Sequence, residues 1–543
     1  MKTHKIIKKV TYSLLIISLF TVGSCNSWLH VLPESERLDD DQFSTESGFQ
    51  DALRGIYILL ASQELYGDYL TWRMLDMLAQ QYYLPSGMSD ASVFTYSYAT
   101  ARLQNYATDI WLKQYHTIAN INNILLYADQ NSGVMHPVMD SVVKGECLAL
   151  RAFCHLDLMR LYGKGNLANR PELADVPSIP YSKDFSFVPP KQYTNRETFQ
   201  LLFADFEQAI KYLEADPIKS LDNRPEGYYN AVSNNGNGLF INATQTANGF
   251  AARRVRMNYY ACLGLYARAL MWEGSPQSKA KALELAQTVT NSGSTDNTSW
   301  YRWVVQSSLS DGNYLFNDNS FIYEHLWSLY VDQMWDYQVR LALSGSDAYR
   351  NWFNAYNPTR SMNCVSLAAS RVNTVFESAL GLAAIDWRYT NGLKNDGDVN
   401  YFAIVKYREE DPADNSTSSY HALKSEMYRK RMPLLRVSEL YYIAAECLAD
   451  SNPEEATRYL NVVRNHRNIP SSFNLQGLTS EQVKEEITKE YMKEFIAEGQ
   501  LFYYYKRLGF PYILGYGLEM TDLEYVFPIP DYEIATGGRV PIN

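Results

Sequence analysis

The sequence predicts a mainly α-helical protein, in which paired helices form a scaffold around an irregular region that contains short strands. Over most of the chain, apolar residues recur at intervals of three and four, the spacing of an amphipathic helix. Several of these segments follow one another in pairs across tight turns. Between residues 293 and 436 the spacing is lost, and Gly, Asn, Asp and Ser accumulate as they do in loops.

The first part of the scaffold contains four predicted helices, at residues 44–67, 111–128, 142–162 and 196–213. In the first of them Phe49, Leu53, Ile56 and Leu60 share one face. Gly163 follows the third helix, and glycine is common just after the end of a helix.

Two further pairs are predicted at residues 251–272 with 279–290 and at 437–448 with 454–466. In the first pair Gly274 ends one helix, Ser275 is the N-cap of the next, and Pro276 occupies its first position. Small residues at the contacts make these pairs similar to tetratricopeptide units. Their periods are irregular and no pair meets the full consensus, so we expect a divergent helical array.

Irregular segments complete the prediction. Residues 320–328 read as a short strand, and Phe94, Tyr96 and Tyr98 occupy alternate positions, which predicts a small exposed ribbon. Such loop-rich regions carry binding groups more often than the elements that hold them.

The first 25 residues predict export. Four lysines precede an apolar run at residues 14–22, and Gly23, Ser24 and Cys25 follow. This order resembles a bacterial lipobox, so we expect residues 1–24 to be a signal peptide that is cleaved before a lipid-modified Cys25. The alternative is a plain signal peptide with an incidental cysteine. No later stretch of about 18 apolar residues predicts a membrane span.

The remaining composition excludes several classes of function. The 49 basic residues and 60 acidic residues give a net charge of −11, the wrong sign for wrapping a nucleic acid. The chain has no HExxH motif, no GxSxG motif and no Walker loop, so a metallohydrolase or a nucleotide-binding enzyme is not expected. A glycosidase with two distant carboxylates stays open as an alternative. Residues 39–41 and 395–398 could ligate Ca²⁺ but lack the twelve-residue loop, so we expect solvated turns and no cofactor.

Cys25 and the segments that follow it resemble the SusD/RagB-type outer-membrane nutrient-binding lipoproteins of Bacteroidetes. The similar segments occur in the family's order along almost the whole chain, at residues 27–33, 43–57, 145–153, 161–163, 385–388, 432–446, 460–464, 498–509 and 527–533. Leu501 and Tyr504 stand where the family often has Arg and Asp, which suggests that apolar or tyrosine packing replaces an ion pair there. We expect Arg436, Glu439 and Arg507 to pair and cap helices.

The resemblance implies a SusD-like fold in a single domain over residues 25–543. Its helical scaffold would span residues 44–292 and 432–509, and its ligand region about 84–107 and 293–431. It also implies a lipid-anchored protein on the cell surface of the outer membrane, without enzymatic activity. Such a protein captures glycans and delivers them to a TonB-dependent SusC-type transporter. Relatives of the RagB type take peptides instead, so a peptide-binding lid of a RagA/RagB-type importer is the alternative.

Candidate ligand residues follow from the chemistry of sugars. Sugar rings present apolar C–H faces that stack on aromatic rings, and their hydroxyls need polar groups at the rim. The ten Trp and 43 Tyr of the chain offer many such rings, most of them expected in the core. The candidates lie in the loop-rich segments: Tyr96, Tyr98, Trp300, Tyr301, Trp335 and Tyr337, with Asp332 and Arg340 as polar neighbours.

Overall fold

The computed structural model describes residues 39–83, 89–220, 223, 250, 253–292, 301–309, 318–339, 366–395, 400–407 and 429–542. The predicted signal segment and Cys25 therefore lie outside the described residues, as do Trp300 and Arg340. No helix in these described ranges is both long enough and apolar enough to cross a membrane.

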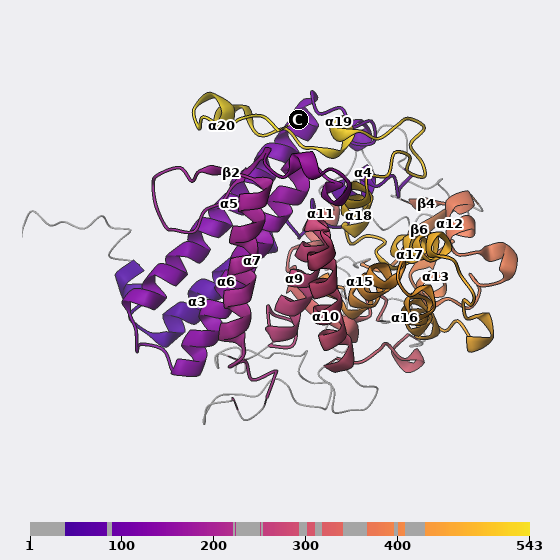
Figure 1. Cartoon of the computed structure of the whole chain (residues 1–543), viewed down its shortest axis with the longest axis horizontal. Helices are drawn as coiled ribbons and strands as arrows, with labels where there is room; N and C mark the ends of the chain where they lie inside the picture. Colours follow the sequence, from indigo (N-terminus) through magenta and orange to yellow (C-terminus); the bar gives the residue numbers. More distant parts are fainter. Residues whose placement is uncertain are drawn as a thin grey trace, which may run out of the picture.

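The protein is mainly helical, as predicted (Figure 1). The helices are α3 Glu46–Leu60, α4 Met74–Leu78, α5 Ala101–Gln130, α6 Pro137–Tyr162, α7 Asn195–Leu213, α9 Tyr259–Glu273, α10 Pro276–Ser292, α11 Met334–Val339, α12 Ala369–Val375, α13 Trp387–Thr390, α15 Val437–Leu448, α16 Pro453–Asn465, α17 Ser480–Glu494, α18 Gln500–Leu508, α19 Asp522–Tyr525 and α20 Asp531–Ala535.

The helices pack mostly on their neighbours in the chain. Helix α6 lies between α5 and α7, and almost every side chain from residue 145 to 162 is buried. Helix α9 packs on α10, α10 on α15, and α15 on α16. Figure 1 shows α3 and α5–α7 on one side of the molecule, α15–α17 on the other, and α19 and α20 across the top. The predicted helical array is therefore present.

Capping residues set the helix boundaries. Gly274 ends α9 in the left-handed region at φ 78°, and the hydroxyl of Ser275 accepts a hydrogen bond from the backbone N–H of Ser278 at 3.2 Å. Helix α9 begins at Tyr259, later than the predicted residue 251, because Asn258 caps it through the N–H of Ala261. Helix α3 ends at Leu60 and not at residue 67, since the chain then turns.

Within the described residues, the strands form three small antiparallel sheets. Strand β1 Pro177–Pro180 pairs with β2 Gln192–Thr194, and β3 His325–Tyr330 pairs with β7 Arg431–Arg436. Strand β6 Tyr401–Ile404 lies between β4 Ser366–Ala368 and β5 Leu393–Lys394. The predicted strand at 320–328 begins later, because residues 322–324 form a 3₁₀ turn.

The prediction of a small exposed ribbon at residues 94–98 is wrong. Tyr96 has a φ of 50°, which belongs to a turn and not to a strand. Its side chain is 6% exposed. The alternating aromatic residues therefore belong to a turn that packs into the core, and not to an exposed strand.

A buried charge cluster joins the C-terminal helices to the loop region; it consists of Arg388, Arg436, Arg467, Glu490 and Glu494. The carboxylate of Glu494 lies 2.5 Å from Nη1 of Arg436, 2.5 Å from Nη2 of Arg467 and 3.1 Å from Nη1 of Arg388. The arginines hold the pKa of Glu494 well below its usual range, although burial alone would raise it. This carboxylate therefore stays charged inside the core.

The expectations for the C-terminal segments are confirmed. Besides Arg436, Glu439 lies 2.6 Å from Nη2 of Arg268, and Arg507 lies 2.6 Å from the carboxylate of Glu446. Leu501 is fully buried, and the ring of Tyr504 stacks on Tyr491 with centroids 4.2 Å apart. Aromatic packing therefore occupies this part of α18.

Candidate functional site

The predicted ligand residues of the early loop pack on α4 and on residues 516–527. The hydroxyl of Tyr96 donates to the carbonyl oxygen of Leu78 at 2.5 Å, and its ring meets Tyr516 edge-on. The hydroxyl of Tyr98 donates to the carbonyl oxygen of Glu524 at 3.0 Å. The enclosed ring of Tyr96 leaves no open face for a sugar, and this corrects its expected exposure.

The later candidates lie on other parts of the scaffold. Tyr301 is 2% exposed and donates to the carbonyl oxygen of Thr290 at the end of α10, so its ring is also closed to a ligand. Tyr337 of α11 is buried, and its carbonyl oxygen accepts a bond from Arg73 at 2.9 Å. Asp332 is exposed beside Lys430, 3.5 Å away. The side chain of Trp335 lies outside the described residues. A ligand role for these residues stays a prediction.

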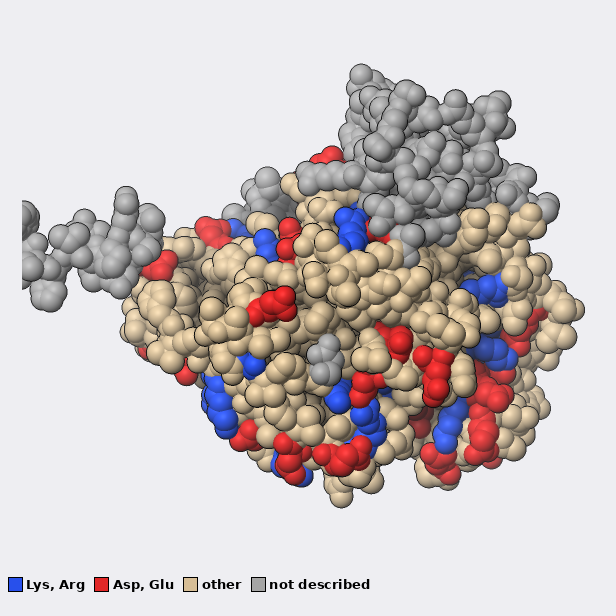
Figure 2. All heavy atoms as spheres, turned by 90° about the horizontal axis from the view of Figure 1, so that it is seen from above, with Lys and Arg blue, Asp and Glu red and all other residues tan. Residues whose placement is uncertain are grey.

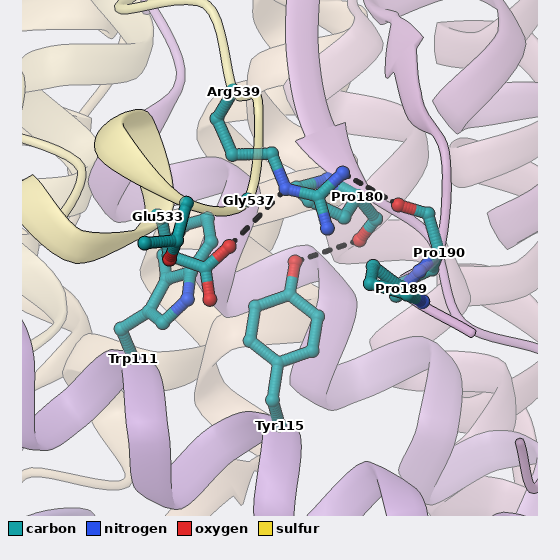
Figure 3. Close-up of a pocket in the computed structure, with 9 residues that line it drawn as sticks. Trp111, Tyr115, Pro180, Pro189, Pro190, Glu533, Gly537 and Arg539 are labelled. Carbon is teal, nitrogen blue, oxygen red and sulfur yellow. Dashed lines mark hydrogen bonds and ion pairs between the residues drawn. The ribbon is translucent and has the colours of Figure 1, made fainter. Parts of the chain in front are cut away.

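A cavity of about 330 Å³ lies elsewhere, where α5, the β1–β2 loop (residues 181–191) and the C-terminal segment (residues 531–542) meet (Figure 3). We call it the α5 pocket. Its walls are aromatic on one side, proline-rich on another, and charged on the third. The residues that line it are Trp111, Tyr115, Pro180, Pro189, Pro190, Glu533, Thr536, Gly537 and Arg539.

Helix α5 supplies the aromatic wall. Trp111 and Tyr115 are four residues apart, so they share one face of the helix, with ring centroids 4.9 Å apart. Trp111 is fixed from behind by the ring of Tyr162 on α6, also at 4.9 Å. The hydroxyl of Tyr115 donates to the carbonyl oxygen of Pro180 at 2.7 Å, which fixes its ring at the mouth of the pocket.

The C-terminal segment supplies the charged wall and is held in place by the β1–β2 loop. Nη1 of Arg539 donates to the carbonyl oxygen of Pro190 at 2.6 Å, and Nε to Glu533 at 3.2 Å. Next to it, the side-chain amide of Gln192 exchanges two hydrogen bonds with the backbone of Val540, at 2.8 and 3.0 Å. The segment therefore closes the pocket through polar contacts.

Polar atoms remain free to meet a ligand. In Figure 3 the third guanidinium nitrogen of Arg539 and the second carboxylate oxygen of Glu533 are on the Tyr115 side of their ion pair. The side chains of Arg539 and Glu533 are 8% and 21% exposed, so both are positioned by protein and still reach the cavity. Donor and acceptor thus lie opposite flat rings, an arrangement that suits a polyhydroxylated ring.

Burial controls protonation around the pocket. Burial raises the pKa of Tyr115 well above its usual range, while Arg539 opposes this, so the hydroxyl stays protonated. Behind Tyr115, burial lowers the pKa of His155 to about 3. The Nε2 of His155 accepts from the N–H of Ser182 at 3.0 Å, so its proton is on Nδ1, which faces the carbonyl oxygen of Arg151. A neutral histidine thereby supports the β1–β2 loop.

The α5 pocket was not predicted from the sequence. Trp111 and Tyr115 fall in a predicted helix, where their spacing indicates a shared face, but an aromatic pair on a helix usually belongs to the core. Glu533 was part of the C-terminal resemblance, yet nothing in the sequence shows that residues 533–539 return to α5 across more than 400 positions.

The surface above α19, α20 and the C-terminal segment carries few charges at its centre. Figure 2 shows this face from above, with most Lys, Arg, Asp and Glu along one border. Exposed apolar side chains occur along the same C-terminal stretch: Tyr512, Leu514, Leu518, Leu523, Ile534 and Val540.

Two family models match the chain in separate segments. One, described as "SusD family", matches residues 385–524. The other, described as "Starch-binding associating with outer membrane", matches residues 27–227. Among curated proteins, no significant match was found.

Solved structures share the fold. The chain is 20% identical to a SusD superfamily protein from Bacteroides thetaiotaomicron, with a TM-score of 0.63 over 91% of this chain and 98% of that one. It is 19% identical to a SusD-like carbohydrate binding protein from Bacteroides vulgatus, with a TM-score of 0.58 over 85% of this chain and 83% of that one. A further SusD superfamily protein from B. thetaiotaomicron gives a TM-score of 0.64 at 14% identity, over 91% of this chain and 97% of that one.

Proposed function

This chain belongs to the SusD/RagB family, and we propose that it captures oligosaccharide or polysaccharide at the cell surface and delivers it to a TonB-dependent SusC-type transporter. A lipid on Cys25 would hold it at the outer membrane. The description of the N-terminal family model, starch binding in association with the outer membrane, supports glycan capture and the location at the outer membrane.

The observation that carries glycan capture is the construction of the α5 pocket. The ring of Tyr115, backed by the buried ring of Trp111, offers flat apolar surface, while Arg539 and Glu533 offer a donor and an acceptor on the opposite wall. A sugar ring needs both, because its C–H faces are apolar and its edge carries hydroxyl groups. At about 330 Å³ the pocket suits one or two sugar units of a longer chain.

Binding without hydrolysis fits the residues of this pocket. A glycosidase uses two carboxyl groups, about 5 to 9.5 Å apart, on opposite sides of the bond that it cleaves. Of the residues that line the α5 pocket, Glu533 alone carries a carboxylate, and Arg539 pairs with it. The lining of the pocket therefore lacks the pair of carboxyl groups that glycoside hydrolysis requires.

The apolar C-terminal stretch supports contact with a protein partner. Tyr512, Leu518 and Leu523 are each at least 66% exposed, an unusual state for large apolar side chains that lie near each other in sequence. Leu523 belongs to α19, which lies at the same end of the molecule as α20, the helix that carries Glu533 of the pocket (Figure 1). A transporter bound here would receive ligand directly from the pocket side.

Calorimetric titration tests the proposal. A form of the chain that starts at Asn26 is titrated with plant and host polysaccharides, their oligomers, and a mixed peptide digest. We expect heat from one glycan class. Binding to peptides alone would overturn glycan capture in favour of a peptide importer, and release of reducing sugar from any oligomer would overturn the non-enzymatic assignment.

A further inference from the structure

A second, smaller cavity lies inside the scaffold, away from the α5 pocket. Its volume is about 30 Å³, enough for a water molecule or an ion of similar size. Helices α6, α9, α15 and α18 supply most of its lining, and α17 adds Tyr491. The residues that line it are Arg160, Arg268, Met271, Trp272, Glu439, Ile443, Tyr491, Gln500, Tyr503, Tyr504 and Arg507. We call it the four-helix cavity.

Three buried polar atoms on its lining side chains have no hydrogen-bond partner: Nη1 of Arg268, Nε1 of Trp272 and the hydroxyl oxygen of Tyr503. The three residues are 6%, 3% and 3% exposed. An unsatisfied buried donor costs about 1 to 3 kcal/mol, so three in one small cavity indicate an occupant that accepts hydrogen bonds.

The arginines around the cavity are already paired with carboxylates. Three arginines line it, but Glu439 is the one carboxylate in its lining, and both of its oxygens already accept from Arg268 at 2.6 to 2.7 Å. The carboxylates that pair with Arg160 and Arg507 are Asp157 and Glu446, which lie outside the lining. Each lining arginine therefore has a carboxylate partner, and an occupant would meet the N–H and O–H groups that these pairs leave over.

We propose that the four-helix cavity binds a monatomic anion of the halide class, with chloride as the physiological occupant. Water accepts two hydrogen bonds and has to donate two others, whereas three side chains that line this cavity each carry an unpartnered donor. A halide accepts from all three and needs no acceptor in return.

The unpartnered donors come from two helices that the sequence places far apart, α9 and α18, beside a residue of α6. Arg268 and Trp272 come from α9 and Tyr503 from α18, while Arg160 of α6 has its guanidinium carbon 3.6 Å from the centre of the Tyr503 ring. Burial raises the pKa of Tyr503 well above its usual range, which keeps its hydroxyl available as a donor. Chloride then stabilises the packed scaffold and does not depend on glycan binding.

The test combines diffraction with thermal unfolding. Crystals of the chain from residue 26, grown in sodium bromide, should show an anomalous peak in the four-helix cavity. The melting temperature should be about 1 to 2 °C higher in sodium chloride than in sodium methanesulfonate at equal concentration, because the anion binds the folded state alone. Methanesulfonate is too large for the cavity.

Variants separate a specific site from a general salt effect. Tyr503→Phe and Trp272→Phe each remove one donor and keep an aromatic ring, so the chloride-specific gain should fall below half in both. Tyr106→Phe is the control, because the buried hydroxyl of Tyr106 donates to Asp90 at 3.0 Å and lies outside the cavity lining. The chloride-specific rise in melting temperature of this variant should equal that of the parent. The proposal would be overturned if the cavity held water and gave no anomalous bromide peak. It would also be overturned if the chloride-specific rise in melting temperature were unchanged in both cavity variants.

Discussion

Arg539 donates a hydrogen bond to the carbonyl oxygen of Pro190 at 2.6 Å, and this contact joins the C-terminal segment to the β1–β2 loop. The same guanidinium group pairs with Glu533 and turns its remaining nitrogen toward the α5 pocket (Figure 3). One side chain therefore closes the pocket and faces its contents.

Replacing Arg539 should weaken glycan binding. Arg539→Met keeps the length of the side chain but removes every donor, and a hydrogen bond to a charged group contributes about 1.5 to 3 kcal/mol, so affinity should fall about 10- to 100-fold. Calorimetry with the glycan identified for the parent protein gives the measurement. Arg196→Met is the matched control, because Arg196 pairs with Asp175 on the exposed surface. Equal affinity in Arg539→Met and the parent would exclude the α5 pocket as the site.

The buried charge cluster should make Glu494 one of the least replaceable residues of the core. Glu494→Gln keeps the shape of the side chain but leaves Arg388, Arg436 and Arg467 without their shared carboxylate. Breaking a buried ion pair by removing one partner costs about 3 to 5 kcal/mol, and we expect a loss of this size in the free energy of unfolding. Urea denaturation followed by circular dichroism measures it.

An exposed pair provides the comparison for Glu494. Glu284 and Lys281 lie one turn apart on α10 with side chains 65% and 44% exposed. Glu284→Gln should change the free energy of unfolding by less than about 0.5 kcal/mol, because water already solvates both charges. If the two variants lost similar stability, the cluster would not have the energetic role assigned to it.

His155 should make the protein less stable in mild acid. In the folded state burial lowers its pKa to about 3, whereas in the unfolded chain the pKa is near 6.5. Between these values the unfolded state binds one more proton, so stability falls as the pH falls below about 6.5. At pH 5.5 the loss from this residue is on the order of 1 kcal/mol.

The effect of His155 is measured as a difference between two proteins. The free energies of unfolding of the parent and of His155→Gln are compared at pH 7.5 and at pH 5.5. His325, whose pKa burial also lowers, is present in both proteins and cancels. The advantage of the parent should shrink by about 1 kcal/mol at the lower pH. A constant difference would show that His155 has the same pKa in the folded and the unfolded protein.

Two glycines on helices should respond in opposite directions to alanine. A Cβ at Gly145 of α6 would lie 2.7 Å from Cγ of Leu213, on the neighbouring α7, so Gly145→Ala should cost about 1 to 3 kcal/mol. A Cβ at Gly55 of α3 would meet no atom within 4 Å, so Gly55→Ala should stabilise by about 0.5 to 1 kcal/mol. Thermal unfolding distinguishes them, and a gain from Gly145→Ala would show that α6 and α7 can move apart.

The helical scaffold could be predicted because its signals are local. Helix α15 has the predicted bounds, and Gly274, Ser275 and Pro276 mark the boundary of α9 and α10 through backbone geometry and capping that neighbouring residues determine. The short strands were harder to place. Strand β3 starts at His325 because its partner β7, more than a hundred residues away, sets the register.

The candidate site could not be predicted because it too depends on contacts between residues that are far apart in the sequence. Aromatic residues in loops suggested exposure, but Tyr96 and Tyr301 find buried hydrogen-bond acceptors in distant backbone. The α5 pocket needs a helix, a hairpin loop and the C-terminal segment at once. Periodicity finds the first of these and says nothing of how Glu533 and Arg539 approach it.

The pairing of β3 with β7 also determines the order in which the chain can assemble. Helix pairs such as α9 and α10 close short loops, which is fast, whereas β3 has to wait for a strand about a hundred residues further on. Refolding should therefore regain most of its far-ultraviolet signal early and bury Trp327, at the centre of β3, late. Until then the edge of β3 is open, and this intermediate is the species from which aggregation would start.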